Sequence, residues 1–258
     1  FRQQFAQVTN PPIDPLREQV VMSLLTSFGR EKNLFEESAD HAHRLEVDSP
    51  VLSASKFETL LSNEDEAYKS AVISLQYDAA TISLEKAINQ VCETVEQRVQ
   101  EGNVVIVLSD RGLQKNTLPI HALLATGAVH HYLVKVGLRC QANIVVDTAT
   151  VRDPHQFATL IGYGATAVCP YLAYEAMNDM VETGDISGIE VGVLAQNYRK
   201  GINKGLYKIL SKMGISTIAS YRGSQLFEIS GMQDEEDSTC LKGTTSRIQG
   251  GGLNDIAA

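Results

Sequence analysis

Polar side chains that could bind a small molecule follow two of the apolar runs in this sequence. Ser109, Asp110 and Arg111 come directly after one run, and Asp147 and Thr148 follow the next. Because ligands of α/β proteins bind at the carboxyl ends of parallel strands, these residues are candidates for a site that takes a small anionic ligand. Asp and Ser also cap the helices that follow such strands, and capping is the alternative interpretation.

A second set of charged residues repeats within one predicted helix. Four lysines recur at every fourth position: Lys200, Lys204, Lys208 and Lys212. Five apolar residues form a neighbouring stripe: Ile202, Leu206, Ile209, Leu210 and Met213. In an acidic chain such a polarised helix favours docking on an acidic partner surface or near a phosphate. A solvated lysine face is the alternative.

Three histidines share one helical segment, but their spacing does not favour a metal site. His130 and His131 are adjacent and point about 100° apart, and His121 is not at i, i+4 spacing from His131. We therefore expect these imidazoles to pack on the surface or between helices. The turn 162–164 could offer backbone N–H groups to an anion, although a glycine that ends a helix is the simpler explanation.

The composition excludes two classes of partner. The chain has 258 residues, of which 43% are hydrophobic and 21% charged, so a full globular core is expected. Its net charge of -9, without a block of Lys and Arg, argues against binding nucleic acid. No apolar run approaches the roughly 18 residues that cross a bilayer, and no signal peptide is evident, so we expect a cytoplasmic protein without a membrane partner.

The cysteines indicate neither a metal site nor a disulfide framework. Cys92, Cys140, Cys169 and Cys240 lie far apart and form no CxxC pair. Motifs for dinucleotides, for nucleotide phosphates, for a serine nucleophile and for catalytic zinc are also absent. We therefore expect buried, unpaired thiols and no metal-binding residue in this chain.

Short apolar runs alternate with longer helical patterns from about residue 70. The predicted strands are 71–75, 104–108, 144–146, 165–169 and 215–219. The predicted helices are 83–100, 119–136, 153–163, 174–183 and the basic helix 198–213, whose periodic part is 205–213. This alternation predicts an α/β fold in which repeated βα units surround a mainly parallel sheet. Both an open doubly wound sheet and a partial or degenerate (β/α) barrel fit, because five units fall short of the eight in a closed barrel.

The two ends of the chain differ from this central part. Residues 1–60 are predicted to be a connector and cap region, because prolines 11, 12 and 15 impose a rigid extended path. Residues 61–231 form the predicted α/β domain. Residues 232–258 are predicted to be a linker, because 233–237 are acidic and 248–253 are too glycine-rich to hold one conformation. The absence of an initial Met leads us to expect an excised fragment.

Four phrases spread along the chain are long enough to resemble a known family. They are FAQVTNPPIDPLRE at 5–18, IGYGATAVCPYLA at 161–173, the stretch 198–228 that includes SYRGSQLFE, and KGTTSRIQGG at 242–251. In content and order they resemble the central domain of the large chain of glutamate synthase. The resemblance covers essentially the whole chain.

The resemblance implies a role in glutamate biosynthesis. In that family a glutaminase domain releases ammonia from glutamine, and a barrel with FMN and an iron–sulfur cluster reduces the adduct of ammonia and 2-oxoglutarate. The central domain lies between them, binds no cofactor, and has a partial barrel-like fold. It follows that residues 1–60 come after the glutaminase domain, that residues 232–258 lead to the FMN-binding barrel, and that this chain alone is inactive. A plastid location is the alternative to the cytoplasm.

The same resemblance implies which residues matter. Thr9 and Asn10 would line the entrance of an ammonia tunnel, with a merely rigid connector as the alternative. The basic helix with Lys200, Lys204 and Lys208 would face the FMN domain and couple the two half-reactions. The turn at Tyr221 and Arg222 would share that face. The rival hypotheses are a free-standing α/β barrel-type enzyme that uses Asp110, Arg111 and Asp147, and a scaffold without contact to the tunnel.

Overall fold

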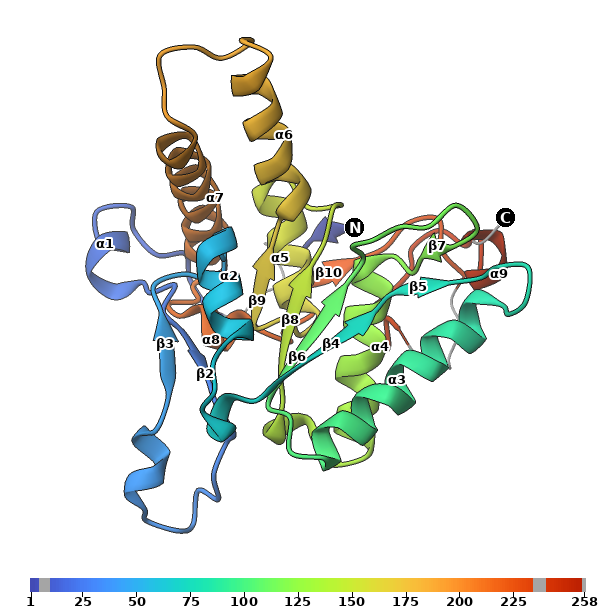
Figure 1. Ribbon diagram of the computed structural model, residues 1–258. Coiled ribbons are helices and arrows are strands. Elements are labelled where there is room, and N and C mark those ends of the chain that lie inside the picture. Colours follow the sequence, from blue (N-terminus) through green and yellow to red (C-terminus); the bar gives the residue numbers. More distant parts are fainter. Residues whose placement is uncertain (5–9, 234–239, 257–258) are drawn as a thin grey trace.

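Four parallel strands form the main sheet of the computed structural model, which describes residues 1–4, 10–233 and 240–256. They are β4 (Ser70–Ser74), β6 (Val105–Ser109), β8 (Asn143–Asp147) and β9 (Ala167–Cys169), and they lie side by side in this order (Figure 1). Each new strand is added on the same side of the last one. This consecutive order is that of a partial (β/α) barrel, whereas a doubly wound sheet would reverse direction. The predicted α/β class is confirmed.

Three helices connect these strands and cover one face of the sheet: α3 (Leu84–Gln100), α4 (Ala122–Lys135) and α5 (Pro154–Gly162). Ser83 starts α3 by accepting a hydrogen bond from the Lys86 N–H, and Asp153 and Gln156 form a reciprocal capping box on α5. The apolar residues of α3 recur on one side and are buried against the sheet. The periodicity of the sequence therefore positions these helices.

The fifth predicted strand, at 215–219, is wrong. Thr217 forms a single isolated bridge to Ser23, and α8 (Ile218–Tyr221) begins at the next residue. The Thr217 hydroxyl accepts a hydrogen bond from the Ser220 N–H, and this cap ends the extended conformation. An apolar run of this length is ambiguous between a strand and a buried helix start.

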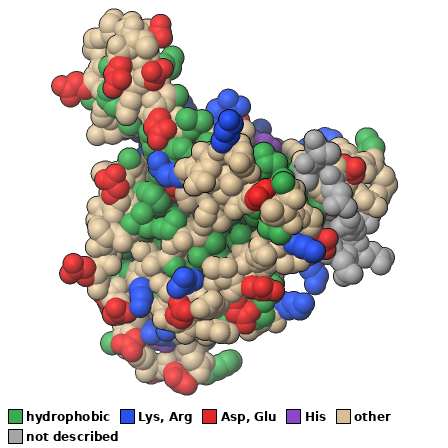
Figure 2. Space-filling view, turned by 45° about the vertical axis from the view of Figure 1, so that its right-hand side comes forward, with side chains coloured by type: hydrophobic (Ala, Val, Ile, Leu, Met, Phe, Trp, Pro, Cys, Tyr) green, Lys and Arg blue, Asp and Glu red, His purple; other side chains and the backbone are tan. Residues whose placement is uncertain are grey.

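Two helices project from the body as a hairpin, α6 (Tyr171–Glu182) and α7 (Val191–Met213) (Figure 1). α7 is longer than predicted because glycines 192, 201 and 205 lower its helix propensity without ending it. Tyr174 is the buried residue of α6, and α7 buries residues only from Ile202 onward. Five carboxylates and no Lys or Arg lie between 171 and 198, and acidic side chains gather on the projecting part (Figure 2).

The N-terminal region covers the sheet face that the helices leave free. It contains α1 (Glu18–Val21), the antiparallel pair β2 (Thr26–Phe28) and β3 (Leu45–Val47), and α2 (Ala54–Leu61). Four of its side chains are buried against inward-facing valines of β6 and β8: Phe28, Leu52, Phe57 and Leu60. The extended segment 50–52 also adds to the sheet beside β9, where the Leu52 N–H donates to the Val168 carbonyl (2.9 Å).

The remaining elements are short. β1 (Arg2–Gln3) pairs with β10 (Phe227–Glu228), β5 (Gln76–Tyr77) pairs with β7 (Leu118–Pro119), and α9 (Leu253–Ile256) follows the glycine-rich stretch. Single turns of 3-10 helix occupy Ala39–Ala42, Glu66–Tyr68 and Arg139–Gln141.

Residues 240–251 pack against the α/β domain. Residues 248 and 251 of the glycine-rich stretch are hydrogen-bonded to residues 231 and 233, contrary to the expectation that 248–253 hold no single conformation. Cys240 and Leu241 are buried, and the Ile229 N–H donates to the Thr245 carbonyl (3.0 Å). Gly127 of α4 permits this packing, because a Cβ there would lie 1.9 Å from the Cys240 carbonyl oxygen. The boundaries at 60/61 and 231/232 and the linker role stay predictions.

Candidate functional site

The residues predicted at the strand ends come together at the carboxyl edge of the sheet. Arg111 Nε and Ser109 Oγ both donate hydrogen bonds to Asp147 Oδ2, at 2.7 and 2.8 Å. Thr148 Oγ1 donates to Asp110 Oδ2 at 2.5 Å. Both carboxylates are therefore engaged by the chain itself. The Asp147 side chain is 1% exposed, and its Oδ1 has no partner within the described ranges.

Arg111 is held in place by Asp147 of β8 and by two side chains of α6. Its guanidinium lies 3.9 Å from the centre of the Tyr171 ring and 3.3 Å from Glu175. Burial lowers the pKa of Arg111, but the hydrogen bond and the charge of Asp147 outweigh burial, so the pKa is raised overall. One guanidinium among the carboxylates of Asp110, Asp147 and Glu175 makes this edge unfavourable for an anion.

The lysines of α7 lie on an exposed face of that helix. Lys200 and Lys204, with Glu18, Met22 and Tyr207, border a groove of about 480 Å³ that we call the lysine groove. In the apolar stripe, residues 202, 206, 210 and 213 are buried and residue 209 is partly buried. α7 thus has a basic outer face and an apolar inner one.

The proline-rich phrase lies over the C-terminus of α7. Thr9 lies outside the described residues. Asn10 is exposed, and a Cβ on Gly214 would lie 2.3 Å from the Pro11 carbonyl oxygen and 2.7 Å from Asn10 Cβ. The Ile13 N–H also donates to the Ser211 carbonyl (2.8 Å). Asn10 is therefore positioned by the end of the helix that carries the lysines.

The two residues of the predicted coupling turn differ in position. Tyr221 is fully buried in the core, and burial raises the pKa of its hydroxyl. Its side chain therefore has no surface to offer another domain. Arg222 is only partly buried, and its Nε has no partner in the described part of the chain. Burial lowers the pKa of Arg222, and the charge of Glu31 opposes this.

A group of arginines that sequence reasoning missed lies near Arg222. Arg44 pairs with Glu31 at 2.6 Å, and the charges of both residues act on Arg222. Arg139 Nε donates to His130 Nδ1 at 3.0 Å. Burial and the charge of Arg222 lower the pKa of Arg139 to about 10. No spacing rule could have joined these residues, because they come from separate parts of the chain.

The contact between His130 and Arg139 predicts a pH dependence of stability. Burial first, and then the charges of Arg139 and His131, lower the pKa of His130 to about 4 from its ordinary value of 6.5. The unfolded chain therefore binds the extra proton between these two values. Stability from this group is complete above pH 6.5 and is lost as the pH falls toward 4. We expect a loss of about 1–2 kcal/mol, discounted for partial exposure.

Urea unfolding between pH 7 and pH 5 measures this effect. His130→Gln keeps an acceptor for Arg139 but does not titrate, so its stability should fall less steeply. The pKa values of His121 and His131 are also lowered by burial, so a shallower slope should remain. If the unfolding free energy fell equally with pH in the variant and in the wild type, the lowered pKa of His130 would be contradicted.

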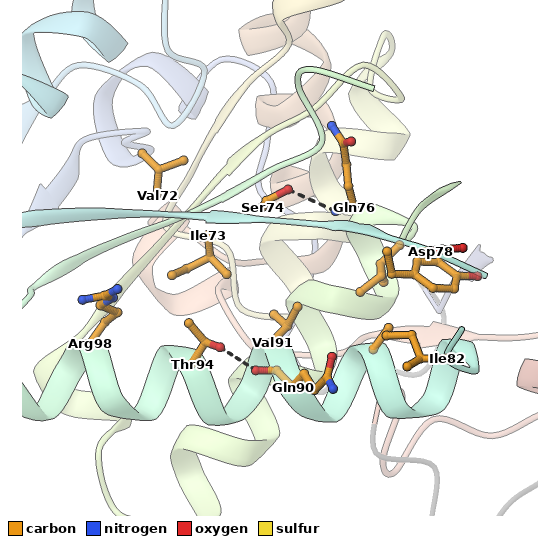
Figure 3. A pocket seen from close by; sticks show the side chains of 13 residues that line it. Val72, Ile73, Ser74, Gln76, Asp78, Ile82, Gln90, Val91, Thr94 and Arg98 are labelled. Atoms are coloured by element: carbon orange, nitrogen blue, oxygen red, sulfur yellow. Dashed lines mark hydrogen bonds between the residues drawn. The ribbon is translucent and has the colours of Figure 1, made fainter. Parts of the chain in front are cut away.

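A second groove lies between β4 and α3 (Figure 3). Its volume is about 440 Å³, and apolar side chains point into it from both elements: Ile73 from the strand, Val91 from the helix and Ile82 before the helix. Polar side chains of Gln90 and Thr94 border it. We call it the edge groove. Periodicity could not reveal it, because it depends on how far α3 stands from the sheet.

Comparison with known proteins decides the family. The family model described as the glutamate synthase central domain matches residues 1–233. This chain belongs to that family. Ferredoxin-dependent glutamate synthase 2 of Synechocystis is 42% identical and is matched over 100% of this chain and 17% of its own length. Glutamate synthase [NADH] of Schizosaccharomyces pombe is 42% identical over 100% of this chain and 12% of its own length.

Other comparisons agree with the family or have no bearing on function. The chloroplastic ferredoxin-dependent glutamate synthase of Spinacia oleracea is 41% identical, and this chain again spans only 17% of its length. Among solved structures, the flavin-binding domain of baker's yeast flavocytochrome b2 aligns with a TM-score of 0.42 at 16% identity, over 67% of this chain and 38% of the other. Likeness at that level does not bear on function.

Membership of the glutamate synthase central domain family helps to decide which candidate sites are functional and which are structural. The network around Asp147 connects β6, β8 and α6, so a structural role explains it. Its excess of carboxylates disfavours the anionic ligand that the rival hypothesis requires. The lysine groove and the Asn10 region remain the candidate functional surfaces of this glutamate synthase domain. Within the described ranges, no helix combines the length and the apolar composition needed to cross a bilayer.

Proposed function

We propose that this chain joins the glutaminase domain of a glutamate synthase to its FMN-binding barrel and helps to wall the passage of ammonia between them. The observation that carries the proposal is the family match over residues 1–233, in a chain that spans 12 to 17% of the length of its relatives. The parent enzyme makes glutamate from glutamine and 2-oxoglutarate. Alone, this chain catalyses neither half-reaction.

The chemistry of ammonia explains why such a wall should be stiff. Ammonium cannot attack a carbonyl group and is costly to remove from water, so ammonia must cross without gaining a proton. Prolines 11, 12 and 15 fix φ and remove three backbone donors after Thr9 and Asn10. Packing of residues 10–13 on the end of α7 supports a tunnel-lining role for Asn10.

The cofactors of the parent enzyme belong to its other parts. An iron–sulfur cluster needs several cysteines in one place. Here Cys92, Cys169 and Cys240 are buried at separate positions, and Cys140 is exposed. This chain does not fit the cluster, and no step of the reaction is assigned to its residues.

Charge reversal on α7 tests the coupling role. In the intact enzyme, Lys204→Glu together with Lys208→Glu should lower the ratio of glutamate formed from 2-oxoglutarate to glutamine hydrolysed. We expect a two- to fivefold change, which is about the effect of losing exposed ion pairs. Labelled 2-oxoglutarate distinguishes the glutamate made from it, and the same assay follows the loss of glutamine. The loss should shrink in high salt, because screening already weakens such pairs.

A matched control is the double variant Lys86→Glu and Lys115→Glu. It changes the net charge equally on exposed positions away from α7. It should leave the coupling ratio, glutamate formed from 2-oxoglutarate per glutamine hydrolysed, unchanged. Equal ratios for the α7 variant and the wild type would remove the lysines from the coupling surface, while the family assignment would stand.

A further inference from the structure

The strand β4 is an open edge of the main sheet. Within the described ranges it pairs with β6 alone. The Lys69 carbonyl accepts a hydrogen bond from β6 at 3.0 Å, and the Leu75 N–H donates one to β6 at 2.8 Å. Because backbone groups alternate sides along a strand, Ser70, Val72 and Ser74 direct their N–H and C=O groups away from β6.

This edge lacks the features that keep edge strands from pairing. Residues 70–74 contain no proline, no charge and no bulge, and Val72 is 57% exposed. The opposite edge of the same sheet is covered, because the segment 50–52 adds to β9. The molecule thus already closes one edge with an extended segment and leaves the other open.

The edge groove supplies a place for a side chain of an added strand. It lies beside β4 and is floored by apolar residues, with the exposed Gln90 and Thr94 of α3 opposite (Figure 3). In strand addition, backbone hydrogen bonds supply affinity and such pockets supply specificity. The groove therefore suits an extended segment with an apolar residue pointing between β4 and α3.

We propose that the β4 edge receives an extended strand from another part of the same polypeptide. The chain spans 12 to 17% of the length of its relatives, so most of the polypeptide lies outside it. A segment of the same molecule meets the edge at a high effective concentration, which a second copy does not. The inference rests only on that part of the proposed function that makes this chain one portion of a longer protein.

Hydrogen–deuterium exchange on the intact enzyme tests this strand. The amides of Val72 and Ser74 should exchange about a hundredfold more slowly than those of the exposed loop at 115–116. Val72→Thr keeps the amide and should behave as the wild type. Val72→Pro removes it at an edge position where proline is tolerated. This variant should speed exchange at Ser74 and at one distant peptide. That peptide contains the added strand.

Two results on the wild type would overturn the proposal. Exchange at Ser74 as fast as in the loop at 115–116 would leave the edge open. Protection that fades on dilution would assign the edge to a second copy instead. If Val72→Pro does not fold, Thr94→Phe blocks the groove from an exposed helix position and should release Ser74 in the same way. None of these measurements depends on ammonia transfer or on the lysines of α7.

Discussion

Replacing Gly214 by alanine is expected to destabilise the protein by about 3 kcal/mol. Gly214 ends α7 with φ 68, a left-handed conformation that costs a residue with a Cβ about 1 kcal/mol or more. The added Cβ would also lie 2.3 Å from the Pro11 carbonyl oxygen, and such overpacking costs about 1–3 kcal/mol. Thermal or urea unfolding of the intact enzyme measures the sum of the conformational and overpacking costs.

Gly188 is a matched control for this substitution. Its φ is 78, and no atom lies within 4 Å of the position that a Cβ would take. Gly188→Ala should therefore cost only the conformational part, about 1 kcal/mol. Equal losses for the two variants would mean that Asn10 and Pro11 do not press on the end of α7.

The same variant has a functional consequence if Asn10 lines the passage of ammonia. Displacing residues 10 and 11 should open the wall, so the intact Gly214→Ala enzyme should lose ammonia to solvent and form less glutamate per glutamine. Gly188→Ala should retain its ammonia. Full retention in both variants would contradict the tunnel-lining role, whatever the change in stability.

Two glycines four residues apart in α7 should respond to alanine with opposite signs. Gly205 faces Pro154 of α5, and a Cβ there would lie 2.3 Å from the Pro154 ring. Gly205→Ala should cost about 2 kcal/mol, because α5 and α7 must separate. Gly201 has open space around its Cβ position, so Gly201→Ala should gain about 0.5–1 kcal/mol from helix propensity.

This pair of variants also tests the position of the projecting hairpin. Unfolding in urea should show a higher midpoint for Gly201→Ala and a lower one for Gly205→Ala. The dependence of the unfolding free energy on urea concentration should be equal in both. A stabilising Gly205→Ala would mean that α7 does not pack against α5 as the structure describes. Because both changes add one methyl group to the same helix, differences in propensity cannot explain opposite signs.

Much of the central domain was predictable because its patterns are local. Four strands and their helices follow from apolar runs and periodicity, and Ser53 and Ser83 mark helix starts by their side chains. The exposed lysines and buried apolar stripe of α7 follow from i, i+4 spacing alone.

The rest depends on contacts between distant segments. The run 215–219 is apolar, but its path is decided by the cap at Thr217. The packing of residues 240–251 requires a backbone approach at Gly127, more than a hundred residues away. Arg44, Arg139 and Arg222 likewise meet only through the fold. Local sequence patterns contain no information on such approaches.

The unbroken length of α7 has a mechanical consequence. The helix touches α5 closely at Gly205, with its projecting end on one side of that point and Asn10 beside its other end. At 1.5 Å per residue, a sideways push of about 2 Å at Val191 would swing Gly214 by about 1 Å the opposite way. A neighbouring domain that pressed on the acidic tip would thus displace the opposite end of α7, where Asn10 lies.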